Sequence, residues 1–360
     1  MRRRLRLPLL AAALLLGIAA LLLSLAEGPR PAQARAEPSF PRWLRQGEVE
    51  RVRARRTLPV SMPPAPAPAW ASGDEPEPPR VRDPFLLALP RDPGKALVVL
   101  EANALRHSRL GELFVECVMR KEGRDPFEEA RREAGIDPLK DIDRVAYTPD
   151  GIILFGFLDR ARLDAIPSRV LSRGEHGRIY VPDAEDPPTF TLGTWRGQII
   201  ALGKPDFVES TLDRLDGSTA EDRVLIPEYL TYGEAYGVVP GAALQGLFRG
   251  EQAELGARIA RAASRIELHA DAMRDVAVVA RFSGADEAAT EDLGTALGGA
   301  LALGRVQAAV SGNASLAELL EHARVVRGAG GFSLELALPI EVVERWFSGC
   351  AGPGSPPAGP

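Results

Sequence analysis

The stretch GQIIALGKPDFVESTLDRL, residues 197–215, indicates what kind of fold to expect. It combines a short apolar strand, a proline and a helix whose apolar residues recur every three or four positions. The stretch GFSLELALPIEVVERWF, residues 331–347, has the same order near the other end of the chain. Pro205 and Pro339 would each lie in the first helical turn, where a missing backbone N–H leaves no hydrogen bond unmade. Strands that lead directly into helices predict an α+β fold.

Two further pairs of segments match loosely and follow the same order along the chain. They are ALVVLEANALRHSRLGELF (96–114) with AYGVVPGAALQGLF (235–248), and GIILFGFLDRARLDA (151–165) with VAVVARFSGADEAA (276–289). We therefore predict two similar strand-helix units, 94–218 and 219–347, that arose by a degenerate duplication. The alternative is chance, because short strand–helix pairs recur in unrelated sequences.

The N-terminus has the pattern of an export signal. Four arginines precede Leu7, and the run Leu7–Ala26 contains no charged residue. About 20 apolar residues suffice to span a bilayer, whereas the apolar part of a secretory signal is usually shorter. Positive charge before the span is typical of a cytoplasmic N-terminus. We predict a signal anchor over 1–26 that spans the bacterial inner membrane once through residues 7–26, with the bulk of the chain extracytoplasmic. The alternative is a cleaved signal peptide and secretion to the periplasm.

Prolines dominate the next part of the chain. From 27 to 93 they recur densely, and SMPPAPAPAW favours an extended polyproline II spacer. We predict a Pro-rich disordered linker over 27–93 and a second disordered segment, GCAGPGSPPAGP, within the tail 348–360.

Composition limits the classes of partner. The chain carries 44 basic and 49 acidic residues, a net charge of −5, which argues against a nucleic-acid partner. Only four of the basic residues are lysines. The arginine excess, together with abundant alanine, glycine and proline, is typical of a GC-rich bacterial genome.

Short carboxylates are concentrated in EAGIDPLKDIDRVAYTPDGIILFGFLD, residues 133–159. An EF-type calcium loop that started at Asp141 would need an acid or amide at its fifth position and a glutamate at its twelfth. Val145 and Ile152 stand there instead. We therefore expect these acids to make turns and strand ends rather than to bind a metal. They are Asp137, Asp141, Asp143, Asp150 and Asp159.

Other reactive residues are scattered. None of the four histidines has a neighbour at the spacing of zinc ligands. We expect His107 and His322 to be exposed helix residues, His176 to lie in a loop and His269 to lie in a strand. Cys117 falls on the apolar face of an expected helix, which favours a buried thiol. An exported chain nevertheless permits a disulfide, and Cys350 is the other cysteine.

No catalytic motif is present, and we assign no catalytic, cofactor-binding or metal-binding residue and no cofactor. The layout of anchor, linker and α+β region resembles that of many bacterial envelope proteins, and this resemblance carries no residues across. The sequence favours a non-enzymatic binding or scaffolding module, membrane-tethered, whose partner is an unidentified envelope protein or polymer. The alternative is a hydrolase or a lipid- or small-ligand-binding protein whose site is built from dispersed residues.

Overall fold

The computed structural model describes most of the chain from Asp83 onward. The described residues are 83–122, 126–163, 168–183, 189–217, 225–227, 230–245, 253–273, 275–312, 314–328 and 330–348. The predicted signal anchor, most of the predicted linker and the tail after residue 348 lie outside them.

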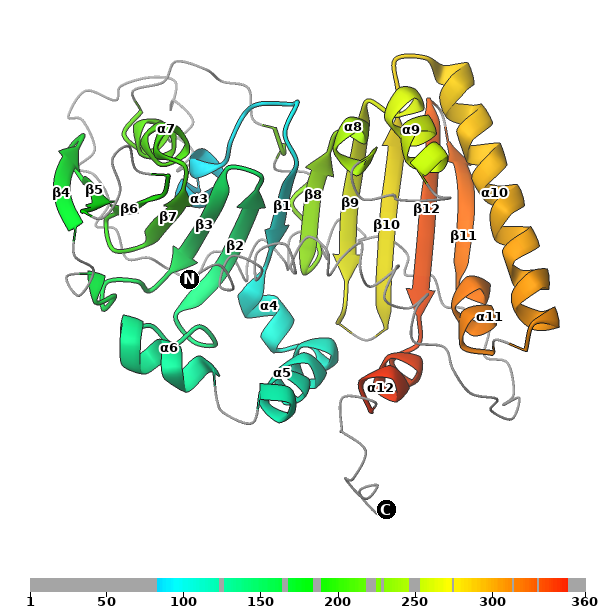
Figure 1. Ribbon diagram of the computed structural model, residues 1–360, viewed down its shortest axis with the longest axis horizontal. Coiled ribbons are helices and arrows are strands. Elements are labelled where there is room, and N and C mark those ends of the chain that lie inside the picture. The colour runs from blue at the N-terminus through cyan, green and yellow to red at the C-terminus, as the bar shows by residue number, and fades with distance from the viewer. Residues whose placement is uncertain are drawn as a thin grey trace, which may run out of the picture.

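The described strands form one twelve-stranded sheet in which neighbouring strands run antiparallel (Figure 1). Their order is β11-β12-β10-β9-β8-β1-β2-β3-β7-β6-β5-β4. The strands are β1 (Leu97–Leu100), β2 (Ile142–Thr148), β3 (Gly151–Gly156), β4 (Ser168–Arg173), β5 (Gly177–Pro182), β6 (Thr191–Trp195), β7 (Ile199–Gly203), β8 (Ala235–Val239), β9 (Arg265–Asp271), β10 (Val276–Ser283), β11 (Ala323–Gly328) and β12 (Gly331–Leu338). This sheet and the helices beside it confirm the α+β class.

Helices lie on the sheet and along one of its ends (Figure 1). They are α3 (Pro84–Ala88), α4 (Ala102–Arg106), α5 (Arg109–Glu122), α6 (Pro126–Ala134), α7 (Pro205–Leu215), α8 (Gly241–Leu244), α9 (Ala253–Ala262), α10 (Glu287–Val310), α11 (Ala314–Glu321) and α12 (Ile340–Ser348). Pro205 begins α7, and Pro339 immediately precedes α12. The sequence correctly places the strand, proline and helix at both positions.

The two main hydrophobic cores lie on opposite faces of the sheet. Successive side chains of a strand point to opposite faces. In β1, Leu97 and Val99 join the first core, which includes Val208 of α7. Val98 between them contacts the second core, which includes Leu293 of α10. Therefore α3 and α7 cover one face of the first half, whereas α8, α9 and α10 cover the other face of the second half.

Strands β1 and β8 join the halves. Leu97–Leu100 pairs with Ala235–Val238 across this seam. Beside it, the Tyr236 hydroxyl donates to Glu101 Oε1 at 2.9 Å, and both residues are buried. The Glu101 N–H donates to the Glu234 carbonyl at 2.8 Å. Because a buried carboxylate is costly without partners, these bonds stabilise the centre of the molecule.

The structure differs from the predicted linker 27–93 in its last residues, since α3 lies inside that range. Phe85 of α3 is fully buried in the first core. The Arg144 side chain, 5% exposed, pairs with Asp83 and lies 4.5 Å from the Phe85 ring and 4.3 Å from the Phe155 ring. A short apolar run between prolines thus folds because it completes the core beside the buried guanidinium of Arg144.

Candidate functional site: the charged strip

A row of charged side chains crosses β9, β10, β12 and β11. We call Arg265, Glu267, Arg281, Arg324 and Glu335 the charged strip. Cross-strand pairing places Glu267 opposite Arg281 and Glu335 opposite Arg324. Alternation puts these residues on the face opposite the second core, because Ile266 and Phe282 of the same strands point into that core.

Within the strip, each carboxylate is held by arginines. Arg265 Nε lies 3.0 Å from Glu267 Oε1, and Arg281 Nη1 lies 3.8 Å from Glu267 Oε2. Arg324 Nη2 lies 2.7 Å from Glu335 Oε2. The glutamate side chains are 18% and 12% exposed, whereas those of Arg281 and Arg324 are 62% and 48% exposed. The surface that reaches solvent is therefore mainly guanidinium, and the acids lie beneath it.

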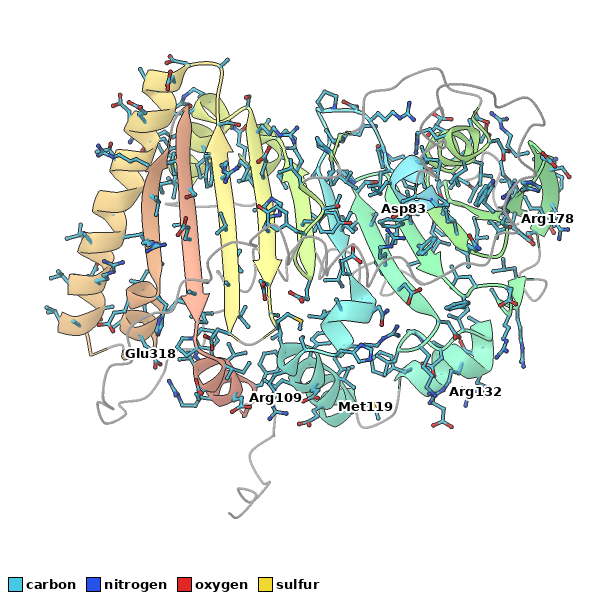
Figure 2. All side chains as sticks on the ribbon, turned by 180° about the vertical axis from the view of Figure 1, so that it is seen from behind. Asp83, Arg109, Met119, Arg132, Arg178 and Glu318 are labelled. Carbon is cyan, nitrogen blue, oxygen red and sulfur yellow. The ribbon has the colours of Figure 1, made fainter. Side chains whose placement is uncertain are left out.

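No described helix lies over the second half of this face, whereas α3 and α7 cover its first half. Seen from behind, the strands of the second half face the viewer, while α10 lies at their edge (Figure 2). Helices α8, α9 and α10 instead belong with the second core on the other face. Within the described residues, the strip is thus a charged part of the sheet with no helix over it.

A buried histidine adjoins the strip. The His269 ring is 4% exposed and stacks on the Tyr232 ring at 3.8 Å between centroids and 4° between planes. Neither ring nitrogen has a hydrogen-bond partner among the described residues. Burial is the main cause that lowers the pKa of His269 to about 4; the Tyr232 backbone opposes this shift, and the charge of Arg281 adds to it. The ring is therefore neutral at pH 7, as two orphaned buried nitrogens require.

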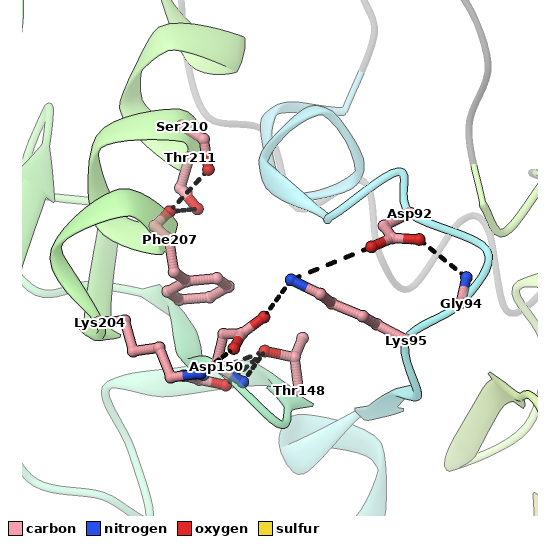
Figure 3. Close-up of polar contacts among 10 residues, drawn as sticks. Asp92, Gly94, Lys95, Thr148, Asp150, Lys204, Phe207, Ser210 and Thr211 are labelled. Atoms are coloured by element: carbon pink, nitrogen blue, oxygen red, sulfur yellow. Dashed lines mark hydrogen bonds and ion pairs between the residues drawn. The ribbon is translucent and has the colours of Figure 1, made fainter. Parts of the chain in front are cut away.

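The aspartates of residues 133–159 lie in turns and ion pairs. Asp150 lies in the hairpin turn between β2 and β3, where Thr148 pairs with Gly151. Lys95 Nζ lies 2.5 Å from Asp150 Oδ2, and Lys204 Nζ lies 2.6 Å from Asp150 Oδ1 (Figure 3). Hydrogen bonds from Lys204 and Lys95 hold the pKa of Asp150 below its usual value. Two of the four lysines thus join the start of β1 and the β7–α7 junction to one turn.

The other acids of the cluster have similar roles. Asp137 accepts from the Leu139 N–H at 3.1 Å, and Asp141 accepts from the Asp137 N–H at 2.7 Å. Asp143 pairs with Arg106 at 3.3 Å. Among the described residues, no group of three or more His, Cys, Asp or Glu side chains is placed to hold a metal ion. Asp159 is placed just after β3, beside Gly197.

Two predictions about single residues are wrong. His322 directly follows α11 and is buried, 7% exposed, although the sequence indicated an exposed helix residue. Burial is the main cause that lowers its pKa. Cys117 is half-buried on α5 and is disulfide-bonded, so it is not the expected thiol. Cys350 lies outside the described residues. His107 is exposed, as expected, but it directly follows α4 instead of lying within a helix, and His176 lies in a turn, as expected.

Sequence reasoning did not find the charged strip. The alternating polar residues of RIELHAD, 265–271, were a usable signal for its first strand. The pairing of Arg324 with Glu335 depends on the register of β11 and β12, which a local pattern does not show.

A scan of family models gives no match, and neither does a search of curated proteins. Among solved structures, the chain is similar to one described as "Structure of crystal form I of TP0453". The two chains share 12% sequence identity with a TM-score of 0.40, over 75% of this chain and 98% of that chain. A likeness of this strength carries no argument about function.

Proposed function

We propose that the protein is a non-enzymatic binding or scaffolding module of the bacterial cell envelope, tethered to the inner membrane and facing away from the cytoplasm. The observation that carries this proposal is the charged strip, which presents exposed guanidinium groups on a part of the sheet that no described helix covers. Arginine binds carboxylates and phosphates through several donors in a fixed plane. The partner is therefore an envelope protein or polymer that offers anionic groups in a row.

The pairing of both strip carboxylates with arginines favours a binding role over a catalytic role for this surface. Glu267 and Glu335 each lie beneath an arginine, with their oxygens 3.0 Å and 2.7 Å from guanidinium nitrogens. Guanidinium groups thus occupy oxygens of both carboxylates, and these oxygens are not free to contact a substrate. The side chains of Arg281 and Arg324, in contrast, are 62% and 48% exposed.

Charge reversal tests this proposal. A double variant, Arg281→Glu with Arg324→Glu, places anions where the partner's anions bind. Arg178→Glu is the matched control, because Arg178 is an exposed arginine on β5 at the far end of the sheet. After crosslinking of intact envelope, the double variant should lose adducts that the wild type and the control retain. Identical adducts in all three chains would refute the proposed surface.

The proposed membrane anchor, residues 7–26, can be tested separately. Alkaline carbonate should leave the full-length chain in the membrane pellet if residues 7–26 span the bilayer. Protease added to spheroplasts should cut before Asp83 and release a fragment that retains the sheet. Release of the intact domain by carbonate would favour a cleaved signal peptide and secretion to the periplasm.

A lipid- or small-ligand-binding role is the second candidate, and His269 is the observation that favours it. Buried polar atoms usually have partners, and an exception needs an explanation, such as a bound ligand, a water or an ion. A bound ligand that satisfied either nitrogen would shift the imidazole resonances of His269. If envelope lipid extracts and small-molecule extracts leave these resonances unchanged, this candidate is refuted.

We also propose that the two units arose by duplication. The order of strands outward from the seam supports it: β1-β2-β3-β7 in the first half corresponds to β8-β9-β10-β12 in the second. A proline and a helix follow the last strand in each run. The helices have since diverged in position, because α7 belongs to the first core whereas α12 packs near α5.

A further inference from the structure

Helix α10 has an outer surface that is unusually apolar for an exposed helix. Leu303, Val306 and Val310 are 67%, 61% and 84% exposed. With the exposed small residues between them they form a stripe at helical spacing, which we call the outer stripe: Gly299, Ala302, Leu303, Val306, Ala309 and Val310. By length and composition α10 is long and apolar enough to cross a membrane, the one such helix among the described residues.

The inner surface of α10 excludes a spanning role in this fold. Leu293 is fully buried in the second core. Gly294 lies against the Phe332 ring so closely that a Cβ there would fall 2.8 Å from Phe332 Cγ. Ala308 is also buried near the other end of the helix. A helix fixed along its length to the sheet can lie on a membrane but cannot pass through it.

The charges of α10 are arranged to leave the outer stripe neutral. Arg305 is the only charged residue between 293 and 310. Its Nε donates to the Leu320 carbonyl at 2.8 Å and its Nη2 donates to the Ala323 carbonyl. The guanidinium is thus directed inward, to the end of α11 and the start of β11. The acids Glu287, Glu291 and Asp292 are confined to the first turns of the helix.

We propose that the outer stripe of α10 docks on the surface of a lipid bilayer. This inference rests on the proposed tether, which brings the domain within reach, since residues 27–82 as a flexible coil span about 40 Å. A protein interface carries about one hydrogen bond per 100–200 Å². The six residues of the outer stripe offer no side-chain donor or acceptor. The exposed amide of Gln307 lies beside them, and Thr295 at the start of the stripe donates to the Glu291 carbonyl. Hydrocarbon needs no such partners, so an exposed apolar helix surface of this kind can be buried at a membrane interface.

Depth measurements on the full-length chain test the docking. The chain is reconstituted in vesicles of phosphatidylethanolamine and phosphatidylglycerol, with an environment-sensitive fluorophore on an added cysteine. Val306→Cys places the label in the outer stripe. Ala288→Cys is the matched control, because Ala288 is exposed on the same side of the same helix among the acids. Brominated lipids should quench the Val306 label at least about twofold more than the Ala288 label.

Further variants separate the alternatives. A double variant, Leu303→Asp with Val306→Asp, should give a label on Val310→Cys the emission of a fluorophore in water. The fold of this variant should persist, because Leu303 and Val306 are both exposed. A chain that does not float with the vesicles refutes both the tether and the docking. A chain that floats while its Val306 label stays in water refutes the docking alone. A Val306 label that is shielded, unquenched by brominated lipid and crosslinked to a second chain would mean that α10 binds a second copy, which also overturns the proposal.

Discussion

Replacement of His269 by phenylalanine should change how the stability of the protein depends on pH. The imidazole is buried, stacked on Tyr232 and without a hydrogen-bond partner at either nitrogen among the described residues. Phenylalanine keeps a planar ring against Tyr232 and removes the titrating group. It also removes two unpartnered polar atoms, each of which costs about 1–3 kcal/mol when buried. The variant should therefore be at least as stable as the wild type at pH 7.

The magnitude of the pH effect follows from the pKa of His269, which burial lowers to about 4 from 6.5. Between these values the unfolded chain binds a proton that the folded chain does not bind. The free energy of unfolding therefore falls as the pH decreases from 6.5 towards 4 and levels off below it. One pKa unit corresponds to about 1.4 kcal/mol, so the full loss is about 3 kcal/mol.

Urea unfolding at a series of pH values from 7.5 to 4 measures this effect. The wild type should lose about 2 kcal/mol between pH 7 and pH 5, and His269→Phe should lose much less. His322 also has a lowered pKa, and Asp143 has a pKa raised chiefly by burial, but both are present in the two proteins and cancel in their difference. Parallel curves for the two proteins would refute the assignment of a buried neutral imidazole at this position.

Further predictions concern turns, the disulfide and α10. Asp150→Asn should lower the free energy of unfolding at pH 7 by about 1 kcal/mol, because the variant loses the ion pairs with two partly exposed lysines. Asp92→Asn is the control, since Asp92 lies 4.0 Å from one lysine, and it should change the free energy of unfolding little in the same urea titration. Cys117→Ala should lower the thermal midpoint, by a destabilisation of about 2–5 kcal/mol, and a reductant should not lower it further. Gly294→Ala should destabilise by about 1–3 kcal/mol because the new Cβ meets a phenylalanine ring. Gly299→Ala, with no atom within 4 Å, should instead stabilise by up to about 1 kcal/mol, and equal effects in thermal melts would contradict the packing of α10.

Local patterns in the sequence were sufficient to predict several elements of the first half of the chain. The hairpin around Asp150 follows from a Thr-Pro-Asp-Gly turn between apolar runs. Helix α6 begins at Pro126 and is followed by Gly135 at φ +71°, as its composition indicates. These features were predictable because their signals lie within a few residues of each other.

Other elements depend on contacts that no local pattern shows. Helix α10 contains four glycines, each of which lowers helix propensity by about 1 kcal/mol relative to alanine. It forms because its inner surface packs on β11 and β12. The burial of His269 likewise depends on Tyr232, which is distant in sequence and comes from the chain before β8. Tertiary packing rather than propensity determined both outcomes.

The pairing of β1 with β8 has a consequence for engineering. Apart from the chain itself, the two halves are joined by four residue pairs across one strand border, by the buried bond between Tyr236 and Glu101, and by the packing of α5 against α12. A break in the chain between α7 and β8 would give two fragments, each with one unpaired strand edge that matches the other. Such fragments are suited to complementation. Reporters fused to them would signal only after the edges meet, and the protein could serve as a split sensor in the envelope.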